Sequence, residues 1–202
     1  MNAPFDVTGI VIETERLILR EWRPTDLNDF YEYASVEGVG ECAGWLHHES
    51  IYESKYRLEK FIKEKKTFAI VYKENDKVIG SLGVEKYGRE EALSEFFSLK
   101  GRSIGFVLSK DYWGRGLMTE AVKAVINYLF DVLDYDFLLC GHFLFNERSR
   151  RVQEKCGFKP YRKLKCTTHW DEELDEIENL LLNPHKDIKL EFSHPETLIY
   201  KD

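Results

Sequence analysis

Hydrophobic residues recur along this chain with two different spacings, and the two spacings alternate. Where they return every three or four positions, as at Leu27, Phe30, Tyr31 and Ala34, the pattern predicts an amphipathic helix. Where they run together between turn-forming residues, as in 67–72, the pattern predicts a strand. We therefore predict helices at 25–34, 50–62, 117–133, 148–156 and 171–182, and strands at 16–20, 67–72, 78–84, 103–108, 136–143, 161–166 and 196–200.

The order of these elements defines the expected fold class. Helices mixed with strands, and a hairpin joined by the polar residues 74–77, imply an α/β protein (α+β mixed sheet). Its single twisted sheet is expected to be partly parallel and partly antiparallel. The helix at 117–133 is apolar around much of its circumference, which favours helices on both faces of the sheet. A length of 202 residues suits one core, so we expect a single domain over 1–202.

Composition narrows the possible functions. Hydrophobic residues make up 43% of the chain and charged residues 32%, as in ordinary soluble proteins. A formal net charge of −7 disfavours nucleic acid as a main partner, because such binding depends on neutralising phosphates. No apolar run approaches the ~20 residues that cross a bilayer, no signal peptide is visible, and the four cysteines lack metal or disulfide spacing. We expect a cytoplasmic protein, a monomer or homodimer, with no metal and no membrane partner.

Charge is unevenly distributed in the last third of the chain. Residues 148–165 contain eight basic residues and one acid, whereas residues 171–178 contain six acids and no base. Each run is either a solvated face or part of a functional surface, and the sequence alone favours neither.

The most informative segment for chemistry is a strand, a glycine-bearing turn and a helix in direct succession. Gly114 and Gly116 lie in the turn between 103–108 and 117–133. Glycine lets the backbone approach a ligand closely, and the first amides of a helix lack partners within it. The turn is therefore either an anion site suited to a pyrophosphate or a plain tight turn. A Walker loop is excluded, because no Gly-Lys-Ser/Thr run with the required spacing exists.

A second candidate segment follows the predicted strand 136–143. Asn146 and Ser149 stand at the start of a short helix that closes at Gly157. Both residue types are favoured at helix N-termini, so capping is the simplest account of each.

Three segments, taken in order, resemble one enzyme family. They are Glu-Arg-Leu-Ile-Leu-Arg at 15–20, Tyr-Trp-Gly-Arg-Gly-Leu-Met-Thr-Glu-Ala at 112–121, and 146–158, with Asn146, Ser149 and a Glu-Lys-Cys-Gly-Phe ending. Together they resemble the GNAT superfamily of N-acetyltransferases, and within it the branch that acetylates ribosomal-protein N-termini at alanine or serine. The resemblance covers about residues 13–162 and leaves 163–202 as a C-terminal extension.

The resemblance implies acetyl-CoA as co-substrate. In such enzymes the pyrophosphate lies on the backbone of a loop that matches Trp113 to Met118 here, with Gly116 as the matching glycine; Trp113 and Met118 depart from the general pattern. The pantetheine arm would lie along the preceding strand where two strands splay apart, hydrogen-bonded by Asn146. The cofactor-binding residues implied in this way are Phe106, Val107, Leu108, Trp113, Gly114, Arg115, Gly116, Leu117, Met118, Thr119 and Asn146.

The implied reaction is direct transfer without an acyl-enzyme. A neutral amine attacks the thioester carbonyl, a backbone amide near Val107 stabilises the oxyanion, and Ser149 assists the departing thiolate. The base is left open: relatives often carry an acid at the position of Ser103, so the choices are His142 or a water chain to solvent. The loop 37–48 is expected to form the acceptor pocket, with Trp45 as its aromatic residue or only as a core anchor.

The acceptor amine is not determined by the sequence. The resemblance favours a protein N-terminal amine, with a small-molecule amine as the alternative. Because Ser103 replaces an acid, a non-catalytic acyl-CoA-binding module is a second hypothesis, and an ATP-binding interaction protein is a weaker third. Comparing the binding of acetyl-CoA, CoA and ATP, and then measuring thiol release with candidate amines, separates them.

Overall fold

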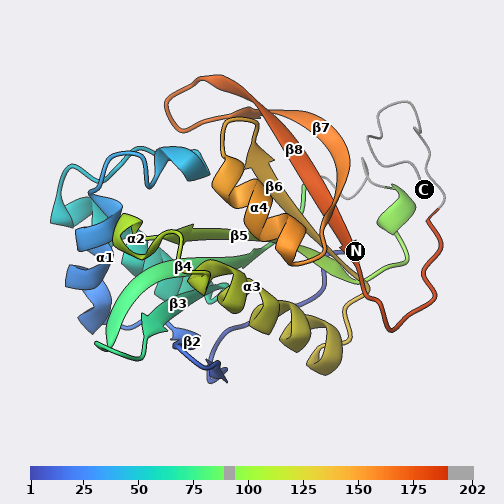
Figure 1. Cartoon of the computed structure of the whole chain (residues 1–202), viewed down its shortest axis with the longest axis horizontal. Helices are drawn as coiled ribbons and strands as arrows, with labels where there is room; N and C mark the ends of the chain where they lie inside the picture. The colour runs from blue at the N-terminus through green and yellow to red at the C-terminus, as the bar shows by residue number, and fades with distance from the viewer. Residues whose placement is uncertain (89–93, 191–202) are drawn as a thin grey trace.

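A computed structural model of the chain describes residues 1–88 and 94–190. Within them the central feature is an eight-stranded sheet with the order β1-β2-β3-β4-β5-β6-β8-β7 (Figure 1). Neighbouring strands run antiparallel except β5 and β6, which are parallel. The strands are β1 (Ile12–Glu13), β2 (Leu17–Glu21), β3 (Thr67–Tyr72), β4 (Lys77–Glu85), β5 (Gly101–Leu108), β6 (Phe137–Phe143), β7 (Lys159–Thr167) and β8 (Glu173–Leu182).

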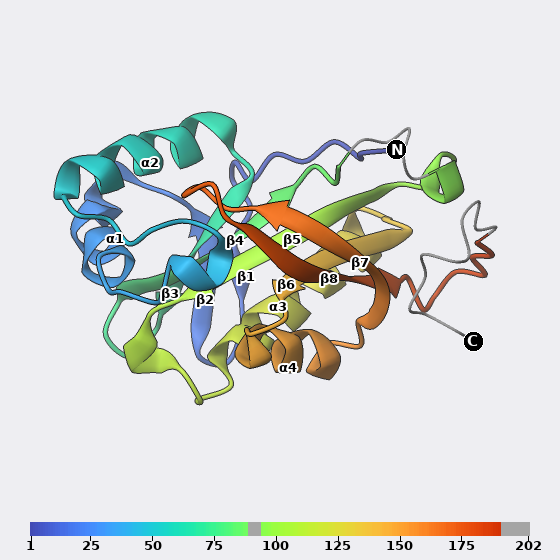
Figure 2. The same cartoon turned by 90° about the horizontal axis from the view of Figure 1, so that it is seen from above.

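Helices cover both faces of this sheet. Figure 2 shows α1 and α2 on one side of the strands and α3 and α4 on the other. The α-helices within the described residues are α1 (Leu27–Ala34), α2 (Ile51–Glu64), α3 (Leu117–Asn127) and α4 (Glu147–Lys155); α3 continues into a π-helical segment, Tyr128–Val132. The predicted fold class, a mixed α/β sheet with helices on both faces, is confirmed.

Burial explains why the strand and helix patterns differ along the chain. In β2, Leu17 and Leu19 are fully buried in the cluster beneath α3, whereas Ile18 packs on the cluster beneath α1 and α2. All six residues of β3 are buried, because both of its faces are covered, and its sequence is correspondingly apolar throughout. Each such fully buried aliphatic side chain contributes about 1.5–3 kcal/mol, which makes these two clusters the main source of stability.

The acidic segment 171–182 is not a helix, so that prediction was wrong. Leu174, Ile177 and Leu181 have helical spacing, but the segment forms β8, which lies between β6 and β7. The charged β7 strand supplies the reason, since Lys163 and Lys165 both pair with Asp175 at 2.8 and 2.9 Å. Arg162 likewise binds Glu178, at 2.6 Å. The basic and acidic runs neutralise each other across a hairpin, and this pairing overrides local helix propensity.

The tail therefore completes the sheet. Residues 163–182, which the sequence assigned to an extension of the core, form part of β7 and all of β8. The predicted strand at 196–200 lies outside the described residues.

The sheet splits between its two parallel strands. β5 and β6 pair only at Gly101 to Ser103 with Phe137 to Leu139, although both strands continue beyond that point. β6 instead pairs with β8 along its full length. From Ile104 and Cys140 onward the two strands are no longer hydrogen-bonded, so backbone groups of β5 that face the gap are free to bind a ligand.

Candidate active site

A cavity of about 670 Å³ occupies the gap between β5 and β6. Its walls come from the end of β5, the turn into α3, the end of β6, the start of α4, the loop after α1 and the β7–β8 hairpin. The side chain of Arg115 and that of Trp45 are outside it. The other sequence-predicted site residues line it together: Phe106, Val107, Leu108, Trp113, Gly114, Gly116, Leu117, Met118, Thr119, His142, Asn146 and Ser149.

One end of the cavity, here called the loop end, is the turn 113–119. Gly114 and Gly116 both have φ of +77°, in the left-handed region that favours glycine. Within the described residues, the backbone amides of 114–119 have no protein acceptor. Several free N–H groups at the start of a helix form a site for an anion.

Basic side chains surround the loop end. Arg148, Arg151 and Lys155 of α4 line the cavity. The Arg148 guanidinium lies over the Trp113 ring, 4.2 Å from its centroid, and the indole Nε1 of Trp113 donates to the Leu108 carbonyl at 2.8 Å. The tryptophan thus fixes the turn to the end of β5 and carries a cation beside the free amides.

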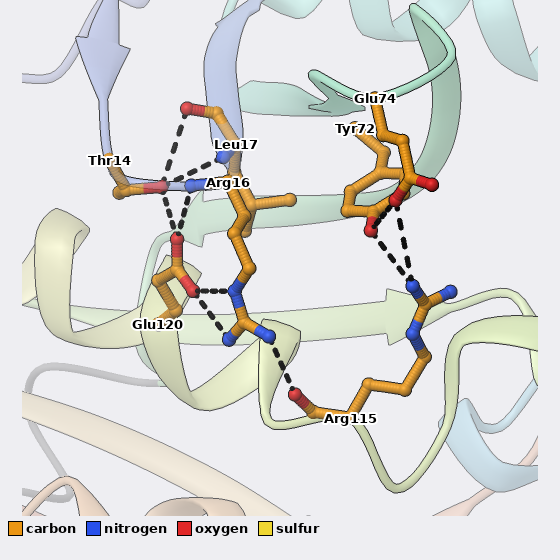
Figure 3. Close-up of polar contacts among 7 residues, drawn as sticks. All are labelled: Thr14, Arg16, Leu17, Tyr72, Glu74, Arg115 and Glu120. Carbon is orange, nitrogen blue, oxygen red and sulfur yellow. Dashed lines mark hydrogen bonds and ion pairs between the residues drawn. The ribbon is translucent and has the colours of Figure 1, made fainter.

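Polar contacts of Arg16 and Glu120 also hold the turn in place, as Figure 3 shows. The Arg16 side chain donates to Glu120 of α3 at 2.6–2.7 Å and to the Arg115 carbonyl at 3.0 Å. Thr14 also donates to Glu120, at 2.6 Å. Burial opposes ionisation of Glu120, but the hydrogen bonds from Thr14 and Arg16 outweigh it and lower the pKa of this carboxyl. The segment at 15–20 therefore contributes to the site indirectly, by holding the turn.

Arg115 does not direct its side chain into the cavity. Its guanidinium donates to the Tyr72 hydroxyl at 2.8 Å, lies 5.0 Å from the Tyr72 ring centroid and is 4.0 Å from Glu74 (Figure 3). Any contribution of Arg115 to ligand binding is thus limited to its backbone.

At the start of α4, Asn146 is the helix cap and Ser149 is not. The Asn146 Oδ1 accepts the Ser149 amide at 3.1 Å, and its Nδ2 donates to the Cys42 carbonyl at 2.9 Å. The Ser149 Oγ accepts from Gln153 Nε2 at 3.0 Å, and no protein acceptor for its hydroxyl hydrogen occurs in the described part of the chain. Ser149 therefore faces the cavity as a potential proton donor.

His142 is held in one tautomer by buried amides. Gln153 Nε2 donates to the Gly141 carbonyl at 3.0 Å, which orients the Gln153 amide so that its Oε1 accepts from Asn179 Nδ2 at 2.7 Å. The same Asn179 nitrogen donates to His142 Nδ1 at 3.0 Å. In the neutral ring the proton is then on Nε2. Burial lowers the pKa of His142 and so favours the neutral ring, and the hydrogen that this tautomer carries on Nε2 argues against His142 as the base.

The opposite end of the cavity, here called the carboxylate end, consists of Glu85, Ser103, Cys166 and Glu176. Glu85 pairs with Ser103 across β4 and β5, and Glu176 pairs with Phe143 across β6 and β8. Paired residues share a face of a sheet, and alternate residues do too, which puts these side chains on the face covered by α1 and α2. His142 and Asn179 lie on the α4 face, so the cavity passes through the sheet.

Glu176 is one of the cavity-lining residues that sequence reasoning missed, together with Glu85, Arg148, Arg151, Lys155 and Cys166. Burial raises the pKa of its carboxyl, and the negative charge of Glu178 adds to this effect. The sequence predicts a helix here, and without the β6–β8 register the segment offers no reason to select one of its six acids.

The loop after α1 contributes only in part. Val39, Cys42 and Ala43 line the cavity. Trp45 instead packs on Gly40 and His48, with its ring centroid 5.1 Å from that of His48, in the cluster beneath α1 and α2. This position matches the core anchor that the sequence left as an alternative.

Comparison with known proteins assigns this geometry to a family. A model described as the acetyltransferase (GNAT) domain matches residues 16–159. The chain belongs to the GNAT acetyltransferase family. The GNAT chain is 33% identical over 127 residues to the protein named "Probable N-acetyltransferase YjcK" of Bacillus subtilis, a match that covers 63% of this chain and 61% of that one.

Solved structures agree on the fold. A GNAT-family acetyltransferase from Bacillus anthracis superposes with a TM-score of 0.75 at 23% identity, covering 86% of this chain and 99% of that one. The ribosomal-protein-S5-alanine acetyltransferase from Vibrio fischeri gives a TM-score of 0.68 at 22% identity, covering 90% and 100%. At these identities the likeness establishes architecture.

Family membership identifies the chain as an acetyl-CoA-dependent N-acetyltransferase. This GNAT protein therefore transfers an acyl group, which removes the ATP-binding and non-catalytic hypotheses as leading accounts. No helix among residues 1–88 and 94–190 has the length and apolarity to span a membrane, and no group of three or more potential metal ligands occurs there.

Proposed function

We propose that this GNAT protein acetylates a primary amine, specifically a protein N-terminal α-amine, by direct attack in a ternary complex. One observation carries the proposal: a single cavity through the sheet joins an amide-rich, basic loop end to a carboxylate end. The first suits the phosphates of acetyl-CoA, and the second suits a cationic amine. The sequence resemblance and the Vibrio fischeri structure supply the acceptor class to test first.

The residues present fit acetyl-CoA. The amides of 114–119 would hold the pyrophosphate, and Arg148, Arg151 and Lys155 would balance its charge. Asn146 Nδ2 keeps one hydrogen for the pantetheine arm, because its other one is bound to Cys42. Ser149 would deliver its hydroxyl hydrogen toward the leaving sulfur while Gln153 holds its oxygen. Cytoplasmic location, the single-domain assignment and the monomer or homodimer stay predictions.

An acceptor panel tests the substrate class. Peptides that begin with alanine or serine, the same peptides with blocked N-termini, polyamines and aminoglycosides are incubated with acetyl-CoA. We expect CoA release and a single acetyl addition, by mass, with the free-N-terminal peptides and not with the blocked ones. Turnover confined to polyamines or aminoglycosides would replace the protein N-terminus with a small-molecule acceptor.

Steady-state kinetics test the direct mechanism. Burial raises the pKa of the Cys166 thiol, and the negative charge of the neighbouring Glu176 carboxylate raises it further, which disfavours a thiolate nucleophile. We therefore expect intersecting double-reciprocal lines when both substrates are varied. Parallel lines, or an acetylated enzyme by intact mass after acetyl-CoA alone, contradict direct attack.

A further inference from the structure

The cavity contains more than one candidate for the group that deprotonates the amine, and their partners distinguish them. His142 presents a donor from Nε2, and Ser103 has no basicity at neutral pH. The Glu85 carboxylate is bound by the Lys66 ammonium at 2.6 Å, which satisfies its charge. A base must have a carboxylate that is free to meet an incoming ammonium.

Glu176 meets that requirement. It lines the cavity and is half-buried, yet no Lys, Arg or His within the described residues forms an ion pair with it. The nearby Arg162 guanidinium is already engaged by Glu178, at 2.6 Å. A carboxylate that is enclosed without a cation gains from binding one, so an ammonium entering this end would be attracted to Glu176.

We propose that Glu176 binds the acceptor as its ammonium ion and removes one proton from it before transfer. This inference rests on the proposed function. The carboxylate takes a proton from R–NH₃⁺ and passes it to solvent; the freed amine forms the N–C bond as the C–S bond breaks. The nitrogen's second proton ends on the sulfur of CoA. Overall, the ammonium and acetyl-CoA give amide, CoA thiol and one released proton.

Gly141 lies directly beside the Glu176 carboxylate. A methyl group added at Gly141 would lie 1.6 Å from Glu176 Oε1, so the absence of a side chain there makes room for the carboxylate. The obstructed atom is the far end of a flexible side chain, and Gly141→Ala is therefore expected to move the carboxylate without unfolding the strand. A displaced Glu176 carboxylate is too poorly placed to accept the proton of the amine.

The groups that face Glu176 determine the pH dependence. They are Glu178 on its own strand, Arg162 and Cys166 on β7, and Glu85 on β4; β6 contributes the non-ionisable Gly141 and Phe143. Burial and the Glu178 charge raise the pKa of Glu176, and the Cys166 and Arg162 side chains partly oppose them. Activity is expected to fall as pH drops through this raised pKa, because the protonated carboxyl cannot accept a proton.

The first experiment compares Glu176→Gln with Glu173→Gln, which removes the same charge from an exposed position on the same strand. At pH 7 we expect kcat/KM for the alanine-ended peptide to fall about 100-fold or more in Glu176→Gln, and to stay near wild type in Glu173→Gln. The deficit should narrow toward pH 9, because free amine then arrives from solution; the unperturbed α-amino pKa is about 7.7–8.0. A pH-independent deficit, or none, overturns the inference.

Two further variants keep the test independent of folding. Glu85→Gln is expected to cost much less than Glu176→Gln, and the reverse order would transfer the role to Glu85. Gly141→Ala should lower kcat/KM as Glu176→Gln does, with the affinity for acetyl-CoA retained. The double variant should then be little worse than either single one, because both remove the same base. Additive losses would show that Gly141→Ala acts elsewhere and would count against the placement of the carboxylate.

Binding measurements distinguish a failure of this inference from a failure of the proposed function. The alanine-ended peptide and its N-terminally blocked form are titrated calorimetrically into the enzyme saturated with CoA. Wild type is expected to prefer the free amine, and Glu176→Gln to lose that preference. Preference without turnover would leave the ammonium site standing and defeat the acetylation proposal. If wild type and Glu176→Gln acetylate the peptide at equal rates and bind it equally, the acetylation proposal stands and the proposed role of Glu176 is wrong.

Discussion

The two ends of the cavity differ in which atoms face the ligand. The loop end presents backbone amides of 114–119, held in place by Trp113 and Arg16, whereas the carboxylate end presents side chains from strands far apart in sequence. A backbone site depends on chain geometry and tolerates changes of side chain. A side-chain site depends on the chemistry of single residues. The departures at Trp113 and Met118 from the family's pattern are therefore compatible with phosphate binding, while one substitution at Glu176 is not expected to be tolerated.

The difference between the loop end and the carboxylate end is tested most strongly at Gly116. In Gly116→Asp, a carboxylate at the N-cap position competes with phosphate for the amides that follow. We expect the Kd for acetyl-CoA to rise on the order of 100-fold, equivalent to about 2.7 kcal/mol. Calorimetric titration measures it.

Arg115→Ala is the matched control for that experiment. It removes a side chain of the same turn that points toward Tyr72 and away from the cavity. The Kd should change by less than about threefold, because an exposed cation contributes little at a distance. Equal small losses in both variants would mean that the turn is only structural.

The same difference explains what the sequence could predict. The turn, α3 and the start of α4 are local, and Gly114, Gly116 and Asn146 have residue types that report their backbone roles directly. All the predicted strands and helices up to residue 166 occur in the structure within a few residues of the predicted bounds. These features follow from short-range periodicity and end preferences.

The carboxylate end could not be predicted in this way. Its geometry depends on the β6–β8 register, which joins Phe143 to Glu176, and on charge pairing in the β7–β8 hairpin. Helical spacing of Leu174 and Ile177 favoured the wrong element, because periodicity contains no information about a distant partner strand. The side-chain directions of Arg115 and Trp45 were likewise not given by the sequence, because a residue's neighbours in sequence do not fix the direction of its side chain.

An intermediate effect is expected at α4, where backbone and side-chain roles meet. Ser149→Ala should lower kcat by up to about 100-fold while the affinity for acetyl-CoA stays near wild type, because its hydroxyl assists only the departing thiolate. Removing the Ser149 hydroxyl leaves the Asn146 cap of α4 intact, because Asn146 Oδ1 accepts from the Ser149 backbone amide and not from its hydroxyl. Single-turnover rates and calorimetry measure the two quantities.

Asn146→Ala is the counterpart of that variant. It removes the cap and should cost about 1 kcal/mol of stability. A Ser149→Ala enzyme with lowered Tm and normal turnover below it would assign Ser149 a structural role and remove it from the mechanism.

The smallest predicted effect concerns the stability cost of the carboxylate end. Because the pKa of Glu176 is higher in the folded than in the unfolded chain, its ionisation destabilises the fold. This cost is present above the folded-state pKa and disappears as pH falls below the unfolded value near 4.3. Glu176→Gln should therefore stabilise the fold at pH 8 by about 1 kcal/mol or less, which corresponds to a rise in Tm of at most roughly 2–4 °C, and the gain should vanish near pH 4. Calorimetric unfolding at both pH values, with Glu173→Gln as control, measures the difference. If Glu176→Gln raises Tm equally at both pH values, the gain comes from packing and not from removal of the charge. A gain confined to high pH, together with reduced turnover, would show that the chain keeps the Glu176 carboxylate for function at a cost in stability.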